Sequence, residues 1–93
     1  MTLKYPPWGK KPQFEIDEFN EPKLWRHGVR DFEVIECFEN TYTVGPHRKC
    51  RPQSDKYGDR YTVRGQTHGG RRLVVHVQYK GAGIVRPITA WEE

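Results

Sequence analysis

One stretch near the carboxyl-terminal end restricts the fold more than any other feature of the sequence. Between residues 72 and 80, every second side chain is apolar, which is the spacing that places side chains on one face of a β-strand. The apolar positions are Leu73, Val75, Val77 and Tyr79. A strand with one apolar face packs that face against other elements, so this stretch predicts a sheet with one buried side.

Two further stretches extend the predicted sheet. Residues 60–66 also alternate, and this alternation places Arg60 and Arg64 on the same face. Residues 84–90 complete the pattern, and glycine-rich turns separate the three stretches. They therefore predict an antiparallel meander. Pro87 has no backbone N–H to donate, which predicts a sheet edge or a β-bulge at that position.

The first half of the chain predicts two helices. Asn20 is a good N-terminal cap, Pro22 suits the first turn, and Gly28 suits the left-handed residue that ends a short helix near residue 27. A second helix is expected over residues 32–39, with Glu33 and Glu36 facing solvent. Its apolar arc would consist of Phe32, Val34, Ile35 and Phe38.

Short strands at residues 14–17 and 42–44 complete the set of expected elements. The order is then a short strand, two helices and a sheet of three to four antiparallel strands, which defines an α+β fold. A chain of 93 residues leaves room for a single domain over residues 1–93. Residues 1–13 contain three prolines and predict an irregular arm, and residues 45–59 predict a long basic loop.

The hydrophobic share of 34% is low, but aromatic residues make up 13% of the chain. Large rings bury much area per residue, so a compact core is still expected. No stretch approaches the roughly 20 apolar residues that span a bilayer, and no secretory leader is recognisable. We therefore expect a cytoplasmic protein without a membrane partner.

Metal and cofactor chemistry has little support in the sequence. Cys37 and Cys50 form no Cys-x-x-Cys pair, and the four histidines are not spaced as paired metal ligands. No nucleotide-binding or acyl-transfer motif is present. We therefore expect no metal and no cofactor, with Cys37 as a buried thiol.

Charge is distributed unevenly along the chain. Lys and Arg number 16 against 12 Asp and Glu, and residues 47–93 hold ten of the basic side chains but four of the acidic ones. Most of these ten are arginines, which suit bidentate phosphate contacts. A basic half of this kind favours a polyanionic partner, most directly nucleic acid. A solvated surface is the alternative interpretation.

Arginines gathered on one sheet face suggest a specific chemistry. Arg86 from the last strand could lie near Arg60 and Arg64, and their guanidinium groups would repel one another without an anion between them. An RNA phosphodiester would meet this need. It could be cleaved without metal if a base takes the 2′-OH proton, cations stabilise the pentacoordinate phosphate and an acid protonates the leaving oxygen.

Three side chains are candidates for moving those protons, namely His27, His68 and Tyr61. Histidine is the residue type that ordinarily changes charge near neutral pH. Each histidine also has a purely structural interpretation. His27 could favour a helix dipole, His68 could be an exposed turn residue, and His76 is expected only to cover the sheet surface.

Several short motifs are similar to those of a known family. Residues 20–29 read Asn-x-x-Lys-Leu-x-Arg-His-Gly-Val, and a helix with Phe32, Glu33 and Phe38 follows. Further on, Arg60 precedes Gly65 by five residues, and Thr67, Gly70, Arg71 and a Leu-Val-Val run follow. In order and spacing, residues 14–91 resemble the BrnT family of bacterial type II toxins. Their closing motif has an arginine where residues 86–91, Arg-Pro-Ile-Thr-Ala-Trp, end in Trp91.

The resemblance implies a RelE-like fold, metal-independent cleavage of RNA, a cytoplasmic location and neutralisation by a small DNA-binding antitoxin. The matching positions are Lys23, His27, Arg60 and Arg86; Arg64 is added from its strand phase. The catalytic residues are then expected to be His27, Arg60, Arg64 and Arg86. Expected RNA contacts are Lys23, Arg48, Lys49, Arg51, Arg71 and Arg72.

Two other functions also fit these observations. The chain could be a non-catalytic nucleic-acid-binding module, which would bind RNA in a salt-dependent manner without cleaving it. It could instead be a protein-interaction module whose basic sheet face binds an acidic partner.

Overall fold

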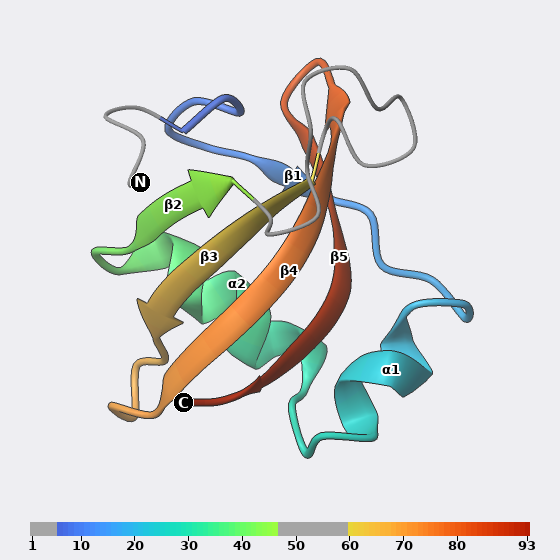
Figure 1. Cartoon of the computed structure of the whole chain (residues 1–93), viewed down its shortest axis with the longest axis vertical. Coiled ribbons are helices and arrows are strands. Elements are labelled where there is room, and N and C mark those ends of the chain that lie inside the picture. Colours follow the sequence, from blue (N-terminus) through green and yellow to red (C-terminus); the bar gives the residue numbers. More distant parts are fainter. Residues whose placement is uncertain (1–5, 47–59) are drawn as a thin grey trace.

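The computed structural model describes residues 6–46 and 60–93 (Figure 1). These residues form one sheet and two helices. In chain order the elements are β1 (Gln13–Phe14), α1 (Glu21–Trp25), α2 (Asp31–Glu39), β2 (Thr43–Pro46), β3 (Arg60–Gln66), β4 (Arg72–Gly81) and β5 (Ile84–Glu92). The predicted α+β class is confirmed.

The sheet has the strand order β1-β5-β4-β3-β2. The pairs β2–β3, β3–β4 and β4–β5 are antiparallel, as the alternation and the turns predict. β1 adds a fifth strand, parallel to β5, through the bond from the Gln13 N–H to the Gly83 carbonyl at 2.8 Å. The sheet is therefore mixed, whereas a purely antiparallel sheet of three to four strands was expected.

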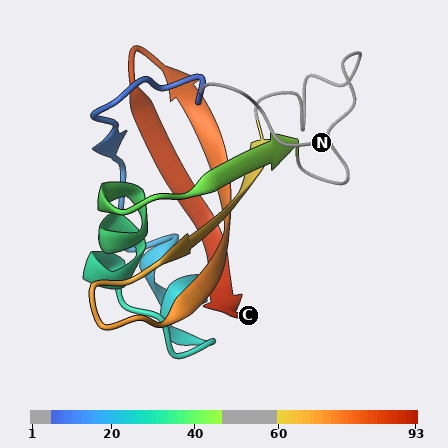
Figure 2. The ribbon, with the colours of Figure 1, turned by 90° about the vertical axis from the view of Figure 1, so that its left-hand side faces the viewer.

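The helix α2 lies against one face of the sheet (Figure 2). It buries Val34, Cys37 and Phe38, which pack against Val63 and Val75 of the central strands in one hydrophobic cluster. The shorter helix α1 contacts β5 and contributes the fully buried Leu24. The opposite side of the sheet, which we call the open face, is the side away from α2.

Several element boundaries differ from the sequence-based expectation. The first strand ends at Phe14 rather than occupying residues 14–17, and α1 ends at Trp25. Gly28, with φ of 73°, confirms the expected left-handed residue beyond that helix. Part of the proposed loop at residues 45–59 belongs to β2, and residues 47–59 lie outside the described part of the chain.

The predicted apolar arc of α2 is wrong at its first turn. Phe32 is 57% exposed, whereas the side chain of Glu33 is only 16% exposed. The reason is an ion pair between Glu33 and Arg71, which draws the carboxylate towards the sheet and turns Phe32 outward. An apolar period cannot show this, because the partner, Arg71, lies far along the chain, just before β4.

The N-terminal arm also contributes to the core, and the expectations for Cys37 and Pro87 are confirmed. Trp8 from the N-terminal arm is 4% exposed, and its Nε1 donates a hydrogen bond to the Tyr42 hydroxyl at 3.0 Å. Cys37 is a buried thiol, and its burial raises its pKa to about 11. Pro87 lies beside a register shift between β4 and β5, where Ile88 is left without a partner across the ladder.

Candidate nucleic-acid interface on the open face

The strand pairing places three rows of side chains across the open face. Paired residues of neighbouring strands share a face, and successive residues of one strand alternate between faces. Each row takes one residue from β3, one from β4 and one from β5. The first row is Arg60, Gln78 and Arg86, the second is Thr62, His76 and Thr89, and the third is Arg64, Val74 and Trp91. Arg60 and Arg64, which strand phase predicts to share a face, therefore do share it, and Arg86 lies on the same face.

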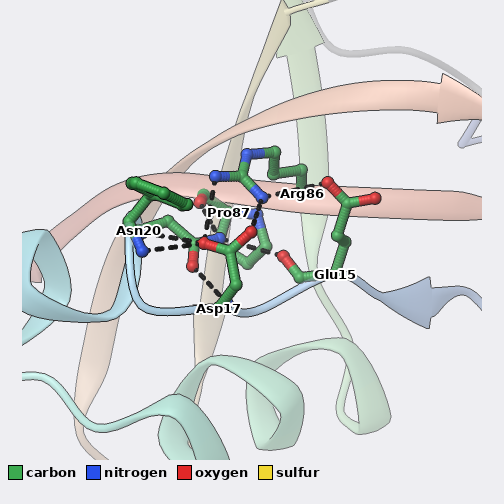
Figure 3. Close-up of polar contacts among 6 residues, drawn as sticks. Glu15, Asp17, Asn20, Arg86 and Pro87 are labelled. Carbon is green, nitrogen blue, oxygen red and sulfur yellow. Dashed lines mark hydrogen bonds and ion pairs between the residues drawn. The ribbon is translucent and has the colours of Figure 1, made fainter.

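Arg86 is held by carboxylates of the chain itself (Figure 3). Its guanidinium donates to Glu15 Oε1 at 2.9 Å and to Asp17 Oδ2 at 2.7 Å. The hydrogen bond from Arg86 is the main reason why the pKa of Asp17 falls to about 2. The same pairing raises the pKa of Arg86. Part of the negative charge that the arginine cluster requires is thus supplied by the segment between β1 and α1.

Asn20 fixes that segment in place. The residue is 2% exposed, and its side-chain Nδ2 donates to the carbonyls of Glu15 and Pro87, both at 2.9 Å. Its Oδ1 accepts the Asp17 N–H at 2.7 Å. Asn20 occupies the predicted N-cap position of α1 but makes no side-chain cap bond. Its amide instead ties the chain entering α1 to β5, which places Asp17 beside Arg86 (Figure 3).

Arg64 makes a looser contact than Arg86. It pairs with Glu93, and the two side chains are 56% and 45% exposed. Exposed pairs of this type contribute at most about 1 kcal/mol to stability, so a phosphate could replace Glu93 at little cost. Arg60, in the first row, is half-buried on the same face.

Arg71 does not lie with these arginines. Its Nε donates to Glu92 at 2.6 Å, and its NH1 donates to Glu33 at 3.0 Å and to the Gly28 carbonyl at 2.9 Å. These bonds connect β5, α2 and the turn after α1, and the two carboxylates raise the pKa of Arg71. The guanidinium therefore joins elements of the fold, although RNA contact was expected from it.

The remaining expected RNA contacts are scattered. Lys23 is exposed on α1, and Arg72 is exposed at the start of β4, on the open face. Arg48, Lys49 and Arg51 lie outside the described residues.

Three rings meet at one end of the open face. Trp91 lies in the third row, with its ring centroid 4.8 Å from that of His76 at an interplanar angle of 84°. The ring of His27 also contacts Trp91, and the two ring centroids are 6.5 Å apart. His27 is exposed just beyond α1, while His76 and Trp91 are half-buried. The proton carrier suggested by the sequence thus lies near the Arg64 row and not near Arg86.

Sequence reasoning assigned no chemistry to His76. The available signal was its phase, because even-numbered residues of β4 share a face with Arg60 and Arg64. His68 lies elsewhere, in the turn after β3, where Nε2 pairs with Glu39 at 3.1 Å.

Comparison with known proteins identifies no family for this chain. No family model matches it, and no curated protein sequence matches it significantly. In residues 6–46 and 60–93 there is no group of three or more His, Cys, Asp or Glu side chains that could hold a metal ion. Nor does this part of the chain contain a helix long and apolar enough to cross a bilayer.

Proposed function

We propose that this protein is a metal-independent endoribonuclease of the toxin type, and that RNA lies along the open face of its sheet. The observation that carries the proposal is the cross-strand register, which puts Arg60 and Arg64 on one face with His76 and Trp91. Cations for phosphate and imidazoles for proton transfer are the groups that RNA cleavage without a metal requires. The motifs that resemble BrnT toxins support the same function.

The proposed reaction is attack of an RNA 2′-OH on the adjacent phosphorus. A neutral imidazole takes the 2′-OH proton, the bond from phosphorus to the 5′ oxygen breaks, and an acid donates a proton to that oxygen. The products are a 2′,3′-cyclic phosphate and a 5′-hydroxyl. Arg60 and Arg64 would bind the charged phosphate oxygens as they develop, and His27 is the proposed proton carrier.

Electrostatics also supports an RNA substrate. The chain carries a formal charge of +4, and Arg64 and Arg72 are exposed on the open face. A phosphate backbone can displace the Glu93 carboxylate from Arg64 because that pair is exposed. Arg86 would contribute mainly by holding the segment before α1 against β5, since Asp17 and Glu15 already bind it and neutralise its charge.

The proposed biological setting follows from the resemblance alone. A toxin of this type acts in the cytoplasm and is neutralised by a small antitoxin protein, which we propose as the second partner. Co-expression with an adjacent small gene product, followed by co-purification, would test this part of the proposal.

The direct test is cleavage of an end-labelled RNA of mixed sequence by purified protein in the presence of EDTA. We expect wild-type cleavage with a 2′,3′-cyclic phosphate terminus and at least an approximately tenfold lower rate for Arg60→Ala, equivalent to about 1.4 kcal/mol of transition-state stabilisation. Arg30→Gln serves as the matched control, because Arg30 is exposed at the start of α2, where its guanidinium lies over the Trp25 ring. Equal rates for wild type and Arg60→Ala would remove the open face from the reaction.

One observation favours binding without cleavage as the second candidate. Arg86 is bound by two carboxylates, and it stands two rows from Trp91, the ring that His27 contacts. The four expected catalytic residues therefore do not converge on one point. RNA retention by a folded protein that never cleaves it would support the binding module. Absence of any RNA affinity at physiological salt would favour the protein-interaction module.

A further inference from the structure

The ring cluster of His27, His76 and Trp91 stands out from the rest of the open face. Its members come from three separate parts of the fold, namely the turn after α1, β4 and β5. The two ring contacts of Trp91 have centroid distances of 4.8 and 6.5 Å. These two contacts restrain the indole and reduce the conformational entropy that a ligand would otherwise have to remove.

The groups around the cluster are polar or cationic. Arg64 occupies the same row as Trp91, and Thr62 and Thr89 flank His76 in the next row. Guanidinium groups track a phosphate backbone, hydroxyl groups can hydrogen-bond the edge of a base, and an aromatic ring offers a stacking surface. The neighbours of the cluster therefore supply each kind of group that recognition of single-stranded RNA uses.

From this arrangement we infer that the cluster centred on Trp91 binds an unpaired nucleobase, so that the substrate is single-stranded RNA. The inference rests on the proposed function only in that the ligand is RNA; it does not depend on cleavage. A base in a duplex is stacked on its neighbours and paired, and it cannot reach a ring on a sheet. An unpaired base can stack there while its phosphates lie against Arg64 and Arg60.

Trp91 also has a structural role that the test must separate from binding. It is paired across the ladder with Val74, which is only 2% exposed although it lies on the open face. Removing the whole side chain would uncover Val74. Trp91→Leu keeps apolar cover over Val74 but removes the aromatic ring, and Trp91→Phe keeps a ring.

The experiment measures affinity for a short fluorescein-labelled RNA whose 2′-hydroxyls are replaced by fluorine. This probe cannot be cleaved through the 2′ oxygen, so binding is read by anisotropy independently of catalysis. The same strand annealed to its complement is the duplex probe. Trp25→Leu is the matched control, since Trp25 is a tryptophan that is 48% exposed on α1.

Stacking of one base on an aromatic side chain is worth about tenfold or more in affinity. We therefore expect Trp91→Leu to weaken single-strand binding at least about tenfold, and to leave duplex binding within about twofold. Trp91→Phe and Trp25→Leu should remain close to wild type. The slope of log affinity against log salt should be unchanged in Trp91→Leu, because no phosphate contact is lost.

Wild-type affinity of Trp91→Leu for the single strand would overturn the inference, as would equal losses on single strand and duplex or an absence of binding by the wild type. If the single-strand effect appears but the wild type never cleaves unmodified RNA, the nuclease proposal fails and the base-binding site stands. If cleavage occurs and Trp91→Leu has no effect on binding, only the base-binding site fails.

Discussion

Replacement of Asn20 by alanine tests how the open face is held together. Asn20 is 2% exposed, and its amide makes three hydrogen bonds to the backbone of the segment before α1 and of β5. Alanine retains none of them. The bond to the Pro87 carbonyl is the critical one, because it is buried and bridges residues 67 positions apart.

The expected cost can be worked out from these contacts. Leaving the buried Pro87 carbonyl without its donor costs about 1–3 kcal/mol, and each of the two partly buried bonds contributes about 0.5–1.5 kcal/mol. We therefore expect Asn20→Ala to lower the free energy of unfolding by about 4 kcal/mol, the middle of the range of about 2–6 kcal/mol that these contributions span. A domain of this size has a total stability of roughly 5–14 kcal/mol, so the loss is a large fraction. For a loss of about 4 kcal/mol, the melting temperature should fall by about 16–32 °C.

Equilibrium unfolding in urea, followed by tryptophan fluorescence, measures this change. Asn20→Asp should be at least as damaging. A carboxylate can still accept the Asp17 N–H, but its buried negative charge would face the Glu15 and Pro87 carbonyl oxygens with no donor between them. Phe19→Ala is the neighbouring control, since Phe19 is 71% exposed, and it should change stability by less than about 0.5 kcal/mol. A loss below about 1 kcal/mol in Asn20→Ala would refute the assignment of Asn20 as the residue that joins this segment to β5.

Three further predictions concern other parts of the fold. The pKa of Asp17 is about 2 when folded, against an ordinary value of 3.8, so its pairing with Arg86 stabilises the protein above pH 3.8 and that stabilisation is lost as the pH falls towards 2. The difference in urea midpoint between wild type and Asp17→Asn should accordingly shrink over this range. Gly65→Ala should cost about 1–3 kcal/mol in urea unfolding, because its new Cβ would lie 2.9 Å from the Cys37 Cβ, whereas Gly69→Ala meets nothing closer than 3.8 Å and should be neutral. Cys37, buried and with its pKa raised to about 11, should resist iodoacetamide at neutral pH in the native protein and react in urea, as read from the mass of its peptide.

The sequence was sufficient to predict the central sheet, because the alternation that marks a strand lies within the strand itself. The bounds of β3 match the expectation of residues 60–66, because alternation over a full strand depends on which face is buried. β1 has only two residues and no period of its own. Its position is set by hydrogen bonds to backbone groups at the edge of β5, and no pattern within residues 13–14 predicts those bonds. The parallel edge of the sheet was therefore missed.

The candidate site was predictable in one respect and not in another. Strand phase placed Arg60 and Arg64 on one face, since that depends only on alternation along one strand. That Arg86 shares this face follows from the register between β4 and β5. The carboxylates that bind Arg86 come from residues about 70 positions earlier in the chain. Their approach depends on the buried amide of Asn20, and no spacing rule in the sequence encodes it. The same holds for Arg71, whose acceptor Glu33 lies 38 positions away.

These ion pairs reduce the positive charge that the basic half of the chain can offer to RNA. Ten basic residues after position 46 suggest a strongly positive surface, but a positive side chain attracts RNA only to the extent that no carboxylate neutralises it. Arg71 and Arg86 are each bound by two carboxylates and hold elements of the fold together. The attraction for a phosphate backbone therefore falls to Arg64 and other side chains of the open face whose contacts are exposed enough to exchange. A basic composition predicts that a polyanion is bound, and only the register and the ion pairs indicate which arginines would bind it.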